Sequence, residues 1–141
     1  MSELLTAEGS CLCGAVTLKT TTMSQQLGAC HCGMCRKWGG GPFLEVDCGQ
    51  GVEIDGEDHV TVFDSSEWAE RGFCKKCGTH LFYRLKEQQE YHLPVGLFGD
   101  SISPVFTLQV FIDRKPEYYT FAEETEKMTE AQIYEMYAPK D

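Results

Sequence analysis

The stretch Cys74-Lys75-Lys76-Cys77 is one of three tight cysteine clusters that decide how this chain of 141 residues is held together. The other two are Cys11-Leu12-Cys13 and Cys30-His31-Cys32-Gly33-Met34-Cys35, and the three clusters contain seven of the eight cysteines. Cysteines one or two residues apart can converge on one ion, and four sulfurs at about 2.3 Å complete a tetrahedral zinc shell. Seven sulfurs therefore predict one complete zinc site and one site with three protein ligands.

The first and third clusters are pairs that lie far apart in the sequence. A zinc ion shared by Cys11, Cys13, Cys74 and Cys77 would link the first strands to the middle of the chain. Such an ion contributes its binding free energy to folding. The two pairs therefore predict a structural zinc site.

The middle cluster favours a more open site. We expect Cys30, Cys32 and Cys35 to lie in one short loop and to supply three ligands, which leaves the fourth position to water or a substrate thiol. The alternative is that Cys48 fills that position, which would give two closed sites and no chemistry. A lone cysteine in a strand-rich segment is more often a small buried hydrophobe than a ligand.

A glycine follows one cysteine of each cluster, namely Gly14, Gly33 and Gly78. Glycine readily adopts the positive φ that turns backbone N–H groups toward thiolate sulfur. The three glycines therefore predict zinc-knuckle turns.

Length and composition predict a single domain over residues 1–141. The segment Met1-Ser2-Glu3-Leu4-Leu5 lacks a basic region followed by an apolar run, and no later stretch is apolar enough to span a bilayer. We therefore expect a cytoplasmic protein with no membrane partner. In that reducing compartment, metal binding explains eight cysteines better than disulfides do.

The formal net charge of −10 argues against a nucleic-acid surface, which needs a basic stripe to displace counterions. Six of the twelve basic residues nevertheless lie beside or near the cysteine clusters: Arg36, Lys37, Arg71, Lys75, Lys76 and Arg84. These cations either offset the negative charge of zinc thiolates or form a local pocket for a small anion. The acidic run Glu123 to Glu126 has the pattern of a solvated face.

The hydrophobic periodicity is mostly that of strands, which predicts a mainly β fold. Strands are expected at Ala15–Lys19, Phe43–Val46, Val60–Phe63, His80–Leu85, Tyr91–Phe98 and Phe106–Ile112. One helix is expected near the end, because Thr129 and Gln132 form a capping box ahead of an apolar stripe of Ile133, Met136 and Tyr137. Pro139 would end this helix.

Three segments together resemble the glutathione-dependent formaldehyde-activating enzyme (GFA) family, which also includes centromere protein V domains. They are Gly9-Ser10-Cys11-Leu12-Cys13-Gly14-Ala15-Val16, Cys30-His31-Cys32-Gly33-Met34-Cys35-Arg36-Lys37, and Arg71-Gly72-Phe73-Cys74-Lys75-Lys76-Cys77-Gly78-Thr79. The stretches Leu97-Phe98-Gly99-Asp100 and Asp113-Arg114-Lys115-Pro116 also sit where the family carries related sequence. The resemblance covers nearly the whole chain.

The resemblance implies a β-tent of mostly antiparallel sheets that is held together by zinc. It also implies carbon–sulfur lyase chemistry on a small thiol adduct such as S-hydroxymethylglutathione, which forms from glutathione and formaldehyde. By the family pattern, the structural zinc is held by Cys11, Cys13, Cys74 and Cys77, and the catalytic zinc by Cys30, Cys32 and Cys35. We expect two zinc ions per chain, with lower occupancy at the three-cysteine site.

An open three-thiolate site suits thiol chemistry better than hydrolysis. A metal favours the thiolate form of a coordinating thiol, and three thiolates make zinc a weaker Lewis acid than three histidines do. Arg36 is the preferred substrate contact, since a guanidinium can pair with a carboxylate of glutathione. His31 is a candidate proton donor, although a residue between two ligands more often points away from the ion. His80 is expected to pack or to form a backbone hydrogen bond, and His59 and His92 are expected to be ordinary surface or strand residues.

Two other interpretations remain open from the sequence, and a third is disfavoured. The chain could act on a small thiol other than glutathione, since no motif for glutathione recognition is evident. It could instead be a non-catalytic module with two structural zinc sites. A redox role for Cys74 and Cys77 is disfavoured, because no βαβ pattern surrounds them and Cys11 and Cys13 give their sulfurs a better use.

Overall fold

The computed structural model describes residues 3–137. Its strands are β1 (Leu5–Ser10), β2 (Thr17–Met23), β3 (Gln26–Cys30), β4 (Phe43–Gly49), β5 (Val52–Asp55), β6 (Val60–Phe63), β7 (Ala69–Cys74), β8 (His80–Leu85), β9 (Glu90–Pro94), β10 (Val105–Val110) and β11 (Glu126–Met128). Its helices are α1 (Gly33–Gly39), α2 (Glu130–Tyr137) and the short 3₁₀ helices η1 (Glu57–His59), η2 (Val95–Phe98) and η3 (Ile112–Arg114). The mainly β prediction is confirmed.

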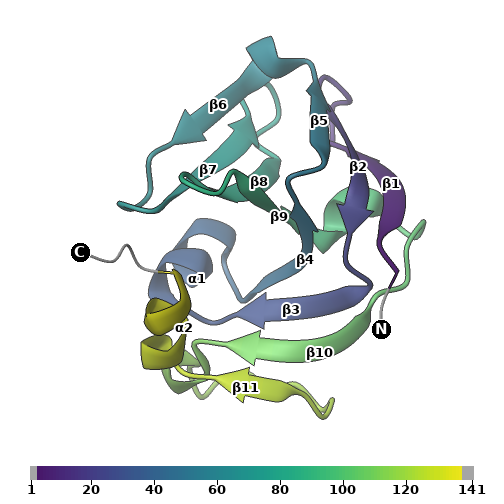
Figure 1. The fold of residues 1–141 in the computed structure, drawn as a ribbon. Coiled ribbons are helices and arrows are strands. Elements are labelled where there is room, and N and C mark those ends of the chain that lie inside the picture. Colours follow the sequence, from purple (N-terminus) through teal and green to yellow (C-terminus); the bar gives the residue numbers. More distant parts are fainter. Residues whose placement is uncertain (1–2, 138–141) are drawn as a thin grey trace.

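The strands form two sheets. A three-stranded antiparallel sheet has the order β1-β2-β5, and an eight-stranded sheet has the order β11-β10-β3-β4-β9-β8-β7-β6. The larger sheet is mixed, because β10 pairs in parallel with both β3 and β11. Figure 1 shows this sheet bending through β4 and β9, so that β6, β7 and β8 form one arm and β3, β10 and β11 form the other. Both α1 and α2 lie at the open side between the two arms.

The hydrophobic core lies where β2 packs against β4 and where β1 packs against η2. Its fully buried apolar side chains include Val16, Leu18, Met23, Val46 and Leu93. Core packing therefore occupies the junction of the two sheets and leaves the space between the arms for a pocket.

Two predicted strands, Val60–Phe63 and His80–Leu85, match the structure at both ends. The expected Phe43–Val46 strand continues to Gly49, and the expected strand at residues 15–19 is β2, displaced toward the C-terminus. The prediction for Tyr91–Phe98 is wrong in its second half, since β9 ends at Pro94 and η2 follows. The prediction for Phe106–Ile112 likewise runs too far, because Phe111 adopts a left-handed φ of 55° and η3 begins. In both segments, the apolar run in the sequence extends past the residue at which the backbone leaves the strand conformation.

The C-terminal helix is confirmed together with its cap. The Thr129 N–H donates to the Gln132 side-chain oxygen at 2.7 Å, and the Gln132 N–H donates to the Thr129 hydroxyl at 3.3 Å. This reciprocal pair is the capping box that the sequence predicts. The side chain of Tyr137, and all of Pro139, lie outside the described residues.

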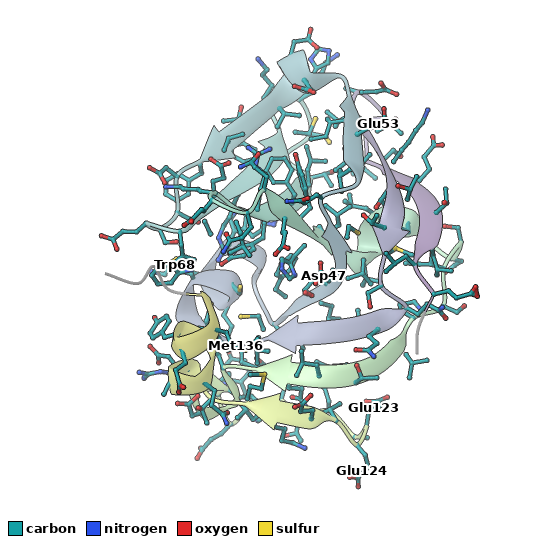
Figure 2. The ribbon with its side chains drawn as sticks, in the orientation of Figure 1. Asp47, Glu53, Trp68, Glu123, Glu124 and Met136 are labelled. Carbon is teal, nitrogen blue, oxygen red and sulfur yellow. The ribbon has the colours of Figure 1, made fainter. Side chains whose placement is uncertain are left out.

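Glu123 and Glu124 lie just before the start of β11, at the outer tip of the arm formed by β3, β10 and β11, and both side chains are exposed (Figure 2). This position agrees with the solvated acidic face expected from the sequence. Among residues 3–137, no helix has both the length and the apolar character that a membrane crossing requires.

Candidate metal centres and the adjoining pocket

The four sulfurs of Cys11, Cys13, Cys74 and Cys77 lie within 4.8 Å of one another. The Sγ atoms of Cys11 and Cys13 are 3.6 Å apart, and those of Cys13 and Cys74 are 3.8 Å apart. Zinc–sulfur bonds of about 2.3 Å require tetrahedral sulfur–sulfur edges of about 3.8 Å. The donor set and its spacing therefore fit a tetrathiolate zinc site.

Turns build this four-cysteine site. Gly14 and Gly78 have left-handed φ values of 81° and 79°, and their N–H groups donate to the carbonyl oxygens of Cys11 and Cys74. The Val16 N–H also donates to Cys11 Sγ at 3.3 Å. The knuckle prediction is thus supported at both of these glycines, and the site connects the small sheet with the arm of β7 and β8.

The three sulfurs of Cys30, Cys32 and Cys35 form the second group. Cys30 ends β3, Cys32 caps the N-terminus of α1, and Cys35 lies within that helix. The Cys35 N–H donates to Cys32 Sγ at 3.3 Å. The expectation of a short loop is therefore wrong, because a helix that the sequence did not predict supplies the third sulfur. Gly33 begins α1 without a left-handed φ, so the knuckle expectation is also wrong at this glycine.

The crowding of these three thiols changes their acidities in opposite directions. The Cys30 and Cys35 thiols donate hydrogen bonds to Cys32 and lower the pKa of Cys32 to about 2. The same contacts raise the pKa of Cys30, because a second thiolate beside the first is disfavoured. The protein alone therefore favours one thiolate here, and three thiolates require a cation, which fits a divalent metal.

Cys48 lies apart from both groups among the described residues. Its side chain is fully buried in the core, its thiol donates to the Val46 carbonyl at 3.7 Å, and burial raises its pKa to about 12. The geometry gives no support to the alternative in which Cys48 completes a second four-cysteine site.

A cavity of about 490 Å³ opens beside the three-cysteine group, and all three cysteines line it. Its floor comes from β3 and β4, one wall from β8 and the loop before β7, and its cover from α2. The four-cysteine group lines no part of this cavity. The two cysteine groups therefore differ in access, and only the second borders a space that could receive a small molecule.

Arg71 contacts the second cysteine group through Cys35. Its guanidinium nitrogens lie 3.6 and 3.7 Å from Cys35 Sγ, and it is stacked between Trp38 at 4.9 Å and Tyr83 at 5.0 Å. The residue is only 3% exposed, and its Nε has no hydrogen-bond partner in residues 3–137. A buried cation at this distance offsets thiolate charge, which is one of the two roles expected for the basic residues near the cysteine clusters.

The residues expected to bind substrate or carry protons are placed differently from one another. Arg36 lines the cavity, and its Nε donates to the His31 carbonyl at 2.9 Å. The His31 ring is fully buried, bonds Tyr119 and Gln109 at 2.8 Å, and does not line the cavity. His80 stacks on Trp38 with ring centres 3.7 Å apart. His31 and His80 thus have packing roles.

His92 has a different environment from the one expected. It lines the cavity, and its Nδ1 lies 2.7 Å from a carboxylate oxygen of Glu45, which also lines the cavity. Burial alone would lower the pKa of His92, but the Glu45 carboxylate outweighs it and raises that pKa to about 9. The available signal in the sequence was Glu45 itself, a carboxylate inside the apolar Phe43–Val46 run.

The sequence model of the glutathione-dependent formaldehyde-activating enzyme family matches residues 6–114. The chain belongs to this family. Among GFA relatives, an uncharacterized lyase of Schizosaccharomyces pombe is 38% identical over 123 residues, which are 86% of this chain and 90% of that protein. A putative glutathione-dependent formaldehyde-activating enzyme of Podospora anserina is 31% identical over 87 residues, and the match spans 41% of that longer protein.

A solved structure shares the GFA fold seen here. The crystal structure of a Rhodobacter sphaeroides protein aligns with a TM-score of 0.58 at 21% sequence identity, over 69% of this chain and 91% of that one. At this identity the match supports the fold alone. The match of the family model to residues 6–114 confirms the family resemblance read from the three cysteine motifs.

Proposed function

We propose that this GFA-family member is a zinc-dependent carbon–sulfur lyase-type enzyme that makes or breaks a small thiol–aldehyde adduct. The observation that carries the proposal is the second cysteine group. Three sulfurs converge at the edge of a cavity, and no fourth side-chain ligand joins them in the described part of the chain. That arrangement is typical of a metal site that keeps one position for substrate.

The proposal gives the two cysteine groups separate roles. Cys11, Cys13, Cys74 and Cys77 would hold a structural zinc, since their sulfurs line no cavity and connect segments distant in sequence. The three sulfurs of the second group would hold the catalytic zinc. A zinc ion bound there would favour the thiolate form of a substrate thiol at neutral pH.

The reaction balances without an oxidant or reductant. In the forming direction, the substrate thiol loses its proton, its sulfur bonds to the aldehyde carbon, and the carbonyl oxygen takes a proton to become a hydroxyl group. In the lyase direction, the hydroxyl loses its proton, the carbon–sulfur bond breaks, the leaving sulfur takes up a proton, and thiol and aldehyde are released. Each direction therefore needs one group that can hold and return a proton.

His92 is the residue we propose for this proton transfer. Glu45 engages its Nδ1, which leaves Nε2 as the atom that would exchange a proton with the substrate oxygen. With a pKa raised to about 9, the imidazole is protonated at neutral pH and can act as an acid in the forming direction. Arg71 would meanwhile hold Cys35 in place through its two guanidinium contacts.

The family name and the Podospora relative point to S-hydroxymethylglutathione, formed from glutathione and formaldehyde, as a first substrate to test. Arg36 is the proposed contact for a substrate carboxylate, because it lines the cavity and forms no ion pair with the described acidic side chains.

Metal content and a thiol titration test this function together. We expect two zinc ions per chain by elemental analysis in the wild type and in Cys48→Ser. Protein with cobalt at the second site should change its visible spectrum on addition of glutathione. Nuclear magnetic resonance with ¹³C-formaldehyde and a thiol should show faster exchange between free aldehyde and adduct with the protein than without it. Loss of the second metal in Cys48→Ser, or no response to any thiol, would instead favour a non-catalytic module with two structural sites.

A further inference from the structure

The cavity is covered by a segment that lies beyond the part of the chain matched by the family. That match ends at residue 114, whereas β11 and α2 occupy residues 126–137. Side chains of both elements line the cavity, among them Met128, Ile133 and Met136. Figure 2 shows Met136, which belongs to α2, and Trp68 on the same open side of the molecule. The cover therefore lies outside the region that the family model matches.

Both arms of the large sheet hold α2 in place. The Tyr134 ring packs edge-on against Trp68, which precedes β7, and against Phe111, which follows β10, at centroid distances of 5.5 and 5.8 Å. Arg114 pairs with Glu130 at the start of the helix. The Glu130 N–H also donates to Asp113 at 2.9 Å. The cover is thus built into the fold, and its apolar face is directed at the cavity.

The surfaces opposite this cover are also mainly apolar. Phe43 from β4, Leu85 from β8, and Leu108 and Val110 from β10 line the cavity. Ser66, which also lines it, uses its hydroxyl to accept from the Ala69 N–H. A ligand in this space would therefore meet methyl, methylene and aromatic groups on both sides.

Most of the charges that border the cavity already have partners. Glu45 pairs with His92, Arg114 pairs with Glu130, and Arg71 contacts Cys35. Arg36 also borders the cavity, and it forms no ion pair with the described acidic side chains. At neutral pH, glutathione carries two carboxylates and an ammonium group, and burying each of them without a partner is unfavourable.

We propose that the thiol used by this protein has an apolar body, aliphatic or aromatic, that lies under α2, with at most one carboxylate, held by Arg36. The inference rests on the proposed function of the three-cysteine site and specifies its substrate class. The thiol sulfur would sit at the cysteines, and the apolar body would extend toward Ile133 and Met128. A tripeptide thiol would bind more weakly than an apolar thiol of similar length.

A series of thiols tests this substrate class. We would titrate cobalt-loaded protein with straight-chain alkanethiols of two to six carbons, and with glutathione, and follow the cobalt–thiolate absorbance. Burial of each added methylene should tighten binding by about threefold to fourfold until the cavity is filled. Hexanethiol should therefore bind more tightly than glutathione.

Substitutions in the segment that covers the cavity test whether α2 causes the dependence of thiol affinity on chain length. Ile133→Ser should reduce the gain per methylene, whereas Ala131→Ser, an exposed residue on the same helix that does not line the cavity, should leave it unchanged. If circular dichroism shows that Ile133→Ser has lost the helix, the same titration is made with Met128→Ser, because Met128 lies on β11 and not on α2.

The outcomes separate the two proposals. A spectral response to thiols that does not depend on chain length, or glutathione binding at least as tightly as hexanethiol, would overturn the apolar substrate class and leave the proposed function standing. An unchanged chain-length dependence in both cover variants would also overturn the role of α2. No response to any thiol would overturn both proposals.

Discussion

The two cysteine groups use similar sequence motifs but have opposite surroundings. The four-cysteine group is made by turns, borders no cavity, and joins the small sheet to one arm of the large sheet. The three-cysteine group is made by a strand end and a helix N-terminus, and it borders a covered pocket of about 490 Å³. A set of sulfurs that is complete by itself favours stability, whereas an incomplete set beside a cavity favours chemistry.

The largest expected effect comes from removing one sulfur of each group. Cys74→Ser should abolish cooperative folding, because structural zinc in small domains contributes about 10–16 kcal/mol of apparent binding free energy. Cys30→Ser should stay folded and lose one zinc ion. Thermal unfolding followed by circular dichroism, with zinc analysis on the same samples, measures both. Equal loss of folding in the two variants would remove the functional distinction between the sites.

The second expected effect concerns the cation beneath the three-cysteine group. Arg71→Met should weaken metal binding at that group by about 10-fold to 100-fold, since partners of metal ligands commonly have effects of this size. Metal binding at the four-cysteine group should not change. Arg84→Met is the matched control, because Arg84 pairs with Glu70 and contacts none of the cysteines in the described structure. Competition with a chelator measures both affinities, and an equal effect of the two variants would contradict the role given to Arg71.

The third prediction concerns how folding stability depends on pH, through the His92–Glu45 pair in the pocket. The pKa of His92 is raised to about 9 in the folded protein, from an ordinary value of about 6.5. A raised folded pKa adds stability that is fully present below pH 6.5 and is lost as pH rises through 9. Glu45→Gln removes the main cause of this rise. Urea unfolding from pH 6 to 10 should therefore show a larger loss in the wild type than in Glu45→Gln, and parallel curves would count against the ion pair.

The smallest expected effect is a difference in folding stability between alanine variants of Gly78, beside the four-cysteine group, and Gly33, beside the three-cysteine group. Gly78→Ala should destabilise the protein by about 1–2 kcal/mol, because φ is +79° there and a side chain is strained in that region. Gly33→Ala should be neutral or slightly stabilising, since Gly33 begins α1, lacks a left-handed φ, and has open space where a Cβ would point. Chemical denaturation of the two variants gives the difference, and equal effects would show that the turn geometry is not the cause.

The parts of the fold that sequence predicted best are segments with a strong local signal. The β6 and β8 strands are rich in β-branched and aromatic residues, and the α2 helix has a capping box that its hydrogen bonds confirm. The α1 helix was missed because it is one short run of seven residues, Gly33–Gly39, with glycine at both ends. Its Cys35 contacts Arg71, which is distant in sequence, and hydrophobic periodicity does not report a contact of this kind.

The candidate site was predictable in its sulfurs and much less so in its other groups. The spacing of cysteines separates four sulfurs from three, and the structure brings together the same two sets. The sequence predicts an ordinary surface or strand residue at His92, because its partner Glu45 is distant in sequence and adjacent only across the β4 and β9 pairing. His31 lies between two cysteines in the sequence, which makes it a candidate proton donor, yet its ring is directed at Tyr119 and Gln109.

The sequence by itself determined the family, the mainly β character and the grouping of the sulfurs, because cysteine spacing within a turn is a local property that one stretch of chain can express. Only the tertiary structure decided which group borders a cavity, which cation lies against Cys35, and that α2 covers the pocket. Those features depend on how the large sheet bends and on which strands become neighbours. Long-range packing sets both, and no single segment of the chain encodes either.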